Sequence, residues 1–251
     1  MRIFLTSSKD EAWDIAAARI IDTAFEGMKL GVATGSTPLG LYARLRQAHA
    51  EGRFSLAGSS AWALDEYVGL AEDHPEGYRN VLRAELVGPD KTGLAEEDLH
   101  TPDGSATDLE AAAAAYEEAI GSVDMQILGI GGDGHIGFNM PSGSLASTTH
   151  VGTLTQETRE ANARFFSDDV SSVPEKCLTQ GLATIMRAKE IILLAFGQAK
   201  ARAVAELIEG PVSAFWPATV LQHHPRVTIV ADELAASELT MIDYYRAKND
   251  W

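Results

Sequence analysis

Cysteine is nearly absent from the sequence, and so are long apolar runs. Cys177 is the one cysteine among 251 residues, which excludes an intrachain disulfide and favours a reducing compartment. A buried or incidental thiol is a better interpretation of it than a nucleophile. No apolar run approaches the roughly 20 residues of a membrane span, and the start, MRIFLTSSKDEAW, does not resemble a signal peptide. These absences predict a cytoplasmic protein without a membrane partner.

Basic residues are also scarce. The chain has 20 Lys and Arg against 36 Asp and Glu, a net charge of -16. Because nucleic acids bind through Lys and Arg on their phosphates, this balance argues against a nucleic-acid partner. It does not exclude a small anion, since a few local cations and backbone N–H groups can hold one phosphate.

No linker-like stretch and no internal repeat divides the chain, so we expect a single domain over residues 1–251. Short apolar runs predict strands, and periodic patterns between them predict helices. This alternation predicts an α/β fold with a mostly parallel central sheet flanked by helices, a modified Rossmann-like arrangement. Ligands of such sheets bind beyond the carboxyl ends of the strands. The strands are expected at 29–34, 60–67, 124–130, 190–197 and 226–232, and the helices at 9–27, 107–121 and 197–210.

The first strand end suits a phosphate. Gly35, Ser36 and Thr37 follow the strand, and Pro38 is expected to open a helix with Thr37 as its N-cap. The unpaired N–H groups of a helix start attract anions, and glycine permits close approach. The Gly-Lys-Ser/Thr of a Walker A loop is absent. A plain capped turn is the alternative interpretation.

The third strand end carries G-x-G-x-x-G, in GIGGDG at residues 129–134. A dinucleotide site would require a helix next, but a glycine and a proline follow within seven residues of Gly134. No acidic residue that could bind a ribose occurs between Gly134 and Gln156. We therefore interpret the glycines as a loop that presents Asp133 and His135, in which a carboxylate can fix the tautomer of a histidine.

Other charged residues follow strands or lie in loops. Asp65 and Glu66 end the second strand, where one of them could act as a general base or both could be solvated. Lys200 lies in the first turn of a helix, which disfavours a cation unless an anion binds there. Arg164 lies in a polar stretch that could close as a lid. Together with the Asp133–His135 pair, these groups suit proton transfer on a sugar phosphate. We see no metal site, because His223 and His224 would point to opposite faces of a strand.

The segments ATGSTP, LDEYVGL, GIGGDGHIGFN, TLTQETREANARFF and LQHHP together resemble the glucosamine-6-phosphate deaminase (glucosamine-6-phosphate isomerase) family, over essentially the whole chain. The 6-phosphogluconolactonases share its fold and a D-G-H segment but lack DEYVGL and HIGFN. The resemblance implies a hydrolase of amino-sugar catabolism that converts glucosamine 6-phosphate to fructose 6-phosphate and ammonia. It implies no metal and no organic cofactor.

The resemblance also implies residue roles. Asp65 would move a proton between C2 and C1 of the open-chain sugar, while His135, oriented by Asp133, would open the pyranose ring. Residues 150–179 would form a mobile lid. The phosphate would bind to Gly35, Ser36, Thr37, Arg164 and Lys200.

The chain departs from the family pattern at three positions. Met140 stands where the family has the Glu of the ring-opening group, and a thioether cannot exchange a proton. Weakened activity, a different phosphosugar in a more apolar pocket, a sugar-phosphate-binding protein without turnover, and a variant chain are the alternatives. Allosteric members have an Arg and a Lys where this chain has His150 and Gly152, so we expect no activation by N-acetylglucosamine 6-phosphate. A monomer and a homo-oligomer both remain open.

Overall fold

The computed structural model describes residues 1–248, so the last three residues of the expected single domain lie outside the described part. Seven strands form one sheet in which every neighbouring pair is parallel, as the alternating pattern predicted. Buried apolar residues fill its central strands, which explains their near-continuous apolar character. The order is β1 (Arg2–Thr6), β10 (Val227–Asp232), β9 (Glu190–Ala195), β6 (Met125–Leu128), β2 (Lys29–Val32), β3 (Ser60–Ala63) and β5 (Leu99–His100).

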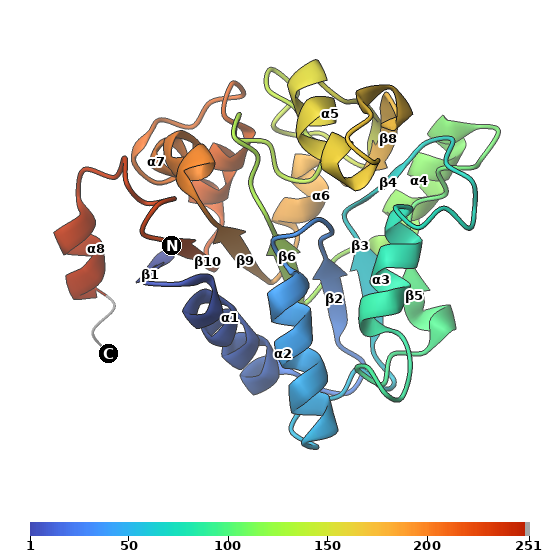
Figure 1. Cartoon of the computed structure of the whole chain (residues 1–251), viewed down its shortest axis with the longest axis horizontal. Helices are drawn as coiled ribbons and strands as arrows, with labels where there is room; N and C mark the ends of the chain where they lie inside the picture. Colours follow the sequence, from blue (N-terminus) through green and yellow to red (C-terminus); the bar gives the residue numbers. More distant parts are fainter. Residues whose placement is uncertain (249–251) are drawn as a thin grey trace.

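Helices α1 (Lys9–Thr23) and α2 (Leu39–Ala50) pack against each other and lie side by side in Figure 1. Gly40 allows this close approach, because a Cβ there would lie 2.2 Å from the Trp13 ring. The other helices are α3 (Tyr78–Leu86), α4 (Leu109–Ile120), α5 (Gln156–Asn162), α6 (Leu182–Met186), α7 (Ala201–Glu209) and α8 (Ile242–Lys248). Among the helices within residues 1–248, none combines the length and apolar character needed to cross a bilayer.

A second, three-stranded antiparallel sheet stands at the carboxyl end of the large one. It consists of β4 (Asp65–Tyr67), β8 (Lys176–Thr179) and β7 (His150–Thr153). The prediction of one continuous strand over 60–67 is therefore wrong. The Leu64 N–H still bonds the Val32 carbonyl, but Asp65 pairs with Thr179 of the small sheet. In Figure 1 the arrowheads of β2 and β3 point toward α5 and the small sheet.

Several expected boundaries also differ. Helix α1 ends at Thr23, four residues before the glycine expected to end it. Thr37 is not an N-cap, because α2 begins at Leu39 with Pro38 before it and no side-chain cap. Asp108, not Thr107, caps α4 by accepting from the Ala111 N–H.

Two further expectations concern the second half of the chain. The helix expected over 197–210 is divided into a 3-10 turn (Gln198–Lys200) and α7. Lys200 therefore precedes α7 and does not lie in its first turn. His223 ends a 3-10 helix (Pro217–His223) and is not in a strand. Strands β1, β5, β7 and β8 were not expected.

Candidate active site

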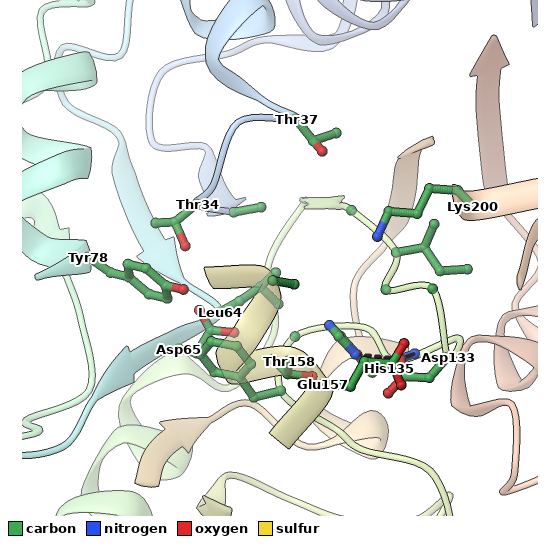
Figure 2. A pocket seen from close by; sticks show the side chains of 18 residues that line it. Thr34, Thr37, Leu64, Asp65, Tyr78, Asp133, His135, Glu157, Thr158 and Lys200 are labelled. Atoms are coloured by element: carbon green, nitrogen blue, oxygen red, sulfur yellow. Dashed lines mark hydrogen bonds and ion pairs between the residues drawn. The ribbon is translucent and has the colours of Figure 1, made fainter. Parts of the chain in front are cut away.

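A cavity of about 180 Å³ opens between the carboxyl end of the large sheet and α5. Segments after four parallel strands meet there: Thr34 and Thr37 follow β2, Asp65 follows β3, residues 129–135 follow β6, and Lys200 follows β9. This is the edge at which ligands of parallel sheets bind. Figure 2 shows Asp65 and Tyr78 on one side of the cavity, and Asp133, His135 and Lys200 on the other.

Asp65 is a buried carboxylate that faces this cavity. Its residue is 5% exposed, and no hydrogen bond from the described residues 1–248 reaches its carboxylate. Burial raises the pKa of Asp65 well above its usual range, and the charge of Glu66 adds to the effect. A carboxyl group with a raised pKa is a better proton acceptor once ionised, which suits a general base.

Glu66 has a different environment, although it is adjacent in sequence. Its carboxylate accepts backbone N–H groups of Tyr67 at 2.9 Å, Tyr78 at 2.9 Å and Arg79 at 2.8 Å. Two of these donors belong to the first turn of α3, whose unpaired N–H groups require acceptors. Of the two carboxylates that sequence could not separate, only Asp65 therefore faces the cavity.

Asp133 and His135 form the expected pair. The Asp133 Oδ1 lies 2.6 Å from the His135 Nδ1 and also accepts the His135 N–H at 3.2 Å. Burial opposes ionisation of Asp133, but the hydrogen bonds and the charge of His135, together with a backbone hydrogen bond, outweigh it, and the pKa of Asp133 is lowered. An ionised Asp133 assigns the proton to Nδ1, so the Nε2 is available for a ligand.

Glycine in the loop makes this pair possible. At Gly131 a Cβ would lie 2.3 Å from the His135 ring, so a side chain would displace the imidazole. At Gly134 the backbone has φ +81 and a Cβ would lie 2.7 Å from the Trp216 ring. The G-x-G-x-x-G pattern thus reflects close packing around a histidine, which agrees with rejecting a dinucleotide site.

Met140 does not lie among the residues that line the cavity. Its sulfur lies 3.6 Å from the Thr158 Oγ1 of α5. Its side chain packs on a second apolar cluster, made of Tyr67, Phe138, Leu154, Ala163, Phe166, Val173 and Cys177. The expectation that this thioether makes the pocket itself more apolar is therefore not supported by its position.

The residues expected to bind phosphate gather at one rim. Thr37 and Lys200 line the cavity. The Arg164 Nη2 lies 3.3 Å from the Ser36 Oγ, which brings the 3-10 turn after α5 to the loop after β2. Gly35 has φ +82, a conformation that favours glycine. Burial lowers the pKa of Lys200, and the nearby Arg164 charge lowers it further, against the raising effects of Asp133 and Glu157.

Sequence reasoning missed the polar cavity residues that lie on helices: Tyr78, Glu157 and Thr158. Tyr78, at the start of α3, lies beside Asp65 in Figure 2, and its hydroxyl lies 3.1 Å from that of Tyr67. Glu157 and Thr158 reach the cavity from α5. The helical spacing of Glu157 and Ala161, both of which line the cavity, was a signal that could have indicated this face.

Within residues 1–248, no three His, Cys, Asp or Glu side chains gather closely enough to bind a metal ion. Cys177 is buried, and burial raises the pKa of its thiol, so it is poorly suited to act as a nucleophile. Proton transfer by carboxylate and imidazole is the chemistry that the cavity residues offer. An α/β fold with these groups and two cations at the rim defines an enzyme of the phosphosugar-converting type.

Comparison with known proteins identifies the family. Residues 8–230 match the family described as glucosamine-6-phosphate isomerases/6-phosphogluconolactonase, and the chain belongs to that family. This confirms the resemblance of its sequence motifs. The chain is 56% identical over 229 residues to a glucosamine-6-phosphate deaminase of Beutenbergia cavernae, covering 88% of this chain and 87% of the relative. A glucosamine-6-phosphate deaminase of Mycolicibacterium smegmatis is 53% identical with the same coverage.

Solved structures agree. A monomeric glucosamine-6-phosphate deaminase superposes with a TM-score of 0.91 at 40% identity, covering 95% of this chain and all of that one. The 6-phosphogluconolactonase from Trypanosoma cruzi has a TM-score of 0.75 at 21% identity, covering 95% of this chain and 97% of that one. The second likeness concerns the fold alone. The expected α/β class with a mostly parallel, helix-flanked sheet is confirmed.

Proposed function

We propose that the protein is a glucosamine-6-phosphate deaminase, which converts glucosamine 6-phosphate and water to fructose 6-phosphate and ammonia. The observation that carries this proposal is one cavity with two separate proton-transfer centres. The carboxylate of Asp65 is buried and accepts no hydrogen bond from residues 1–248, and the Asp133-bound His135 lies in the same cavity. Relatives at 53–56% identity bear that enzyme name.

The chemistry requires both centres. The C2 proton becomes acidic only after the pyranose opens to the C1 aldehyde, which needs a proton removed from the C1 hydroxyl and one given to the ring oxygen. We assign this exchange to the His135 Nε2, with Asp133 holding its other nitrogen. Lys200, Arg164 and the loop of Gly35, Ser36 and Thr37 hold the phosphate at the rim.

Asp65 then acts on the open chain. It takes the proton from C2 and returns it to C1, while a proton passes from the C2 amine to the C1 oxygen. The C1 carbonyl thereby becomes a hydroxyl, and a C2 imine remains. Water adds to C2 and ammonia departs, giving fructose 6-phosphate. A desolvated carboxylate suits this step, because removal of water strengthens it as a base toward carbon.

The test is the release of ammonia and fructose 6-phosphate from glucosamine 6-phosphate, with galactosamine 6-phosphate in parallel. We expect equimolar products from the gluco sugar and their loss in Asp65→Asn. Thermal stabilisation by the sugar with no turnover would overturn the proposal in favour of a sugar-phosphate-binding protein. Turnover of only another phosphosugar, without ammonia, would overturn it in favour of an isomerase or lactonase.

A further inference from the structure

Glu157 is a cavity residue to which the steps above assign no role. It lies in the first turn of α5 on the lid, and it lines the same cavity as Asp65 and His135. Within residues 1–248 its carboxylate has neither a hydrogen bond nor an ion pair, whereas Glu160 of the same helix bonds Gln156. A carboxylate without a partner at the cavity wall is available for a ligand.

The other titratable groups of the cavity are already engaged. Asp133 is held by His135, and Tyr78 by Tyr67. Lys200 belongs to the cationic rim. Asp65 is the buried carboxylate assigned to C2. By elimination among the cavity residues, Glu157 is the remaining carboxylate to which no partner and no step is assigned.

Its position also agrees with one particular atom of the substrate. Glu157 and Asp133 are both close enough to Lys200 to raise the pKa of that amine, whereas Asp65 is influenced by Glu66. Glu157 therefore lies toward the phosphate rim and the histidine. In a hexose 6-phosphate the ring oxygen is bonded to C5, one carbon from the phosphate-bearing C6, so a group between rim and histidine can reach it.

We propose that Glu157 is the second acid–base residue of ring opening, acting with His135. This inference rests on the proposed deaminase function. One of the two groups takes the proton of the C1 hydroxyl, the C1–O5 bond breaks, and the other gives a proton to the ring oxygen. The lid thus delivers a catalytic group when it closes, which explains how the cavity tolerates a methionine at position 140.

Met140 offers a route to test the assignment. Its sulfur contacts Thr158, the neighbour of Glu157 in sequence. The side chain of a glutamate at position 140 could therefore reach the part of the cavity where Glu157 lies. A carboxylate supplied from position 140 should then substitute for one lost from position 157. A role of Glu157 in helix stability alone predicts no such compensation, because Thr155 already caps α5.

The experiment compares wild type, Glu157→Gln, Glu157→Asp, Glu160→Gln and the double variant M140E/E157Q on glucosamine 6-phosphate, with kcat, KM, Tm and the pH dependence of kcat. We expect Glu157→Gln to lower kcat by about 10²-fold with little change in KM or Tm. The pH dependence of kcat in Glu157→Gln should lose one of the limbs seen in wild type. Glu157→Asp should retain partial activity, Glu160→Gln should match wild type, and the double variant should recover at least about tenfold over Glu157→Gln.

A Glu157→Gln variant with kcat within about threefold of an active wild type would overturn the inference and leave the proposed function intact. A fall in kcat accompanied by a matching fall in Tm, and no recovery in the double variant, would overturn it in favour of a structural role. An inactive wild type would overturn the proposed function itself, and this inference with it.

Discussion

The Asn162 Nδ2 donates a hydrogen bond of 2.9 Å to the hydroxyl of Tyr67. Asn162 ends the lid helix α5, and Tyr67 ends β4, the strand that begins with Asp65. The Tyr78 hydroxyl lies 3.1 Å from the same oxygen. Three elements therefore meet at one hydroxyl group, and α5 is held against the strand that carries the buried carboxylate.

Removing that hydroxyl should weaken the closed lid. In Tyr67→Phe the Asn162 amide and the Tyr78 hydroxyl both lose a partner, at about 1–3 kcal/mol. We expect KM for glucosamine 6-phosphate to rise and kcat/KM to fall about five- to 140-fold, since 1.4 kcal/mol corresponds to tenfold. Steady-state kinetics measure this.

The matched control is Gln156→Ala, which removes an exposed side chain of α5 that bonds only Glu160 among residues 1–248. It should leave kcat/KM unchanged. Equal kcat/KM in Tyr67→Phe and wild type would contradict a role for this hydroxyl in holding the lid.

Asp65 should limit activity on the acidic side. Because burial raises its pKa, the ionised base is lost as the pH falls through a value above the usual range of a carboxyl group. Asp65→Asn should lower kcat by about 10²–10⁴-fold at every pH. An acidic limb of the wild-type profile at the ordinary pKa of an aspartate would contradict the assignment.

The same shift has a consequence for stability. The folded state binds the Asp65 proton more tightly than the unfolded state, so wild type loses stability as the pH rises through the raised pKa. Asp65→Asn should therefore unfold at a higher temperature than wild type at pH 8, and the difference should shrink toward pH 4. Thermal melts across this range measure it. Glu97→Gln, which neutralises an exposed carboxylate, is the control and should leave this pH dependence unchanged.

The five inner strands of the large sheet could be predicted from sequence because they are largely buried and read as apolar runs, whereas the edge strands β1 and β5 were not expected. The small sheet could not, because β7 and β8 are short and contain polar residues such as His150 and Lys176. The strand pairing of the small sheet could not be predicted either, because β4 pairs with β8, which lies more than a hundred residues later in the sequence. The break at Leu64 lies inside an apolar run and leaves no local signal.

For the site, residues after strands were predictable because parallel strands bring their carboxyl ends to one edge. This reasoning found Asp65, Thr37, Asp133, His135 and Lys200, which the structure gathers in one cavity. It could not find Tyr78 or Glu157, which reach the cavity from helices. Their placement depends on how α3 and α5 pack, and no strand end marks them.

Lys200 should bind the phosphate group. Loss of a charge-assisted contact to an anion weakens binding by about 1.5–3 kcal/mol, so Lys200→Ala should raise KM about tenfold or more. Because its pKa is lowered, binding should also weaken at a pH below the usual titration range of a lysine. Competition by inorganic phosphate, measured from neutral to alkaline pH, tests both points. Lys176→Ala, an exposed lysine on β8, is the control and should leave KM unchanged. An unaltered KM in Lys200→Ala would contradict the assignment.

Gly152 argues against activation by N-acetylglucosamine 6-phosphate. It pairs with Cys177 across β7 and β8, and a Cβ at this position would lie 2.9 Å from the Cys177 sulfur and 3.6 Å from the Phe138 carbonyl oxygen. The lysine expected here in allosteric members would therefore displace β7 from β8, at about 1–3 kcal/mol for overpacking. We expect substrate curves with and without N-acetylglucosamine 6-phosphate to coincide in the wild type, and Gly152→Lys to lower the Tm without creating a response. A large shift of the wild-type curve to lower substrate concentration would show that an activator site exists without these two residues.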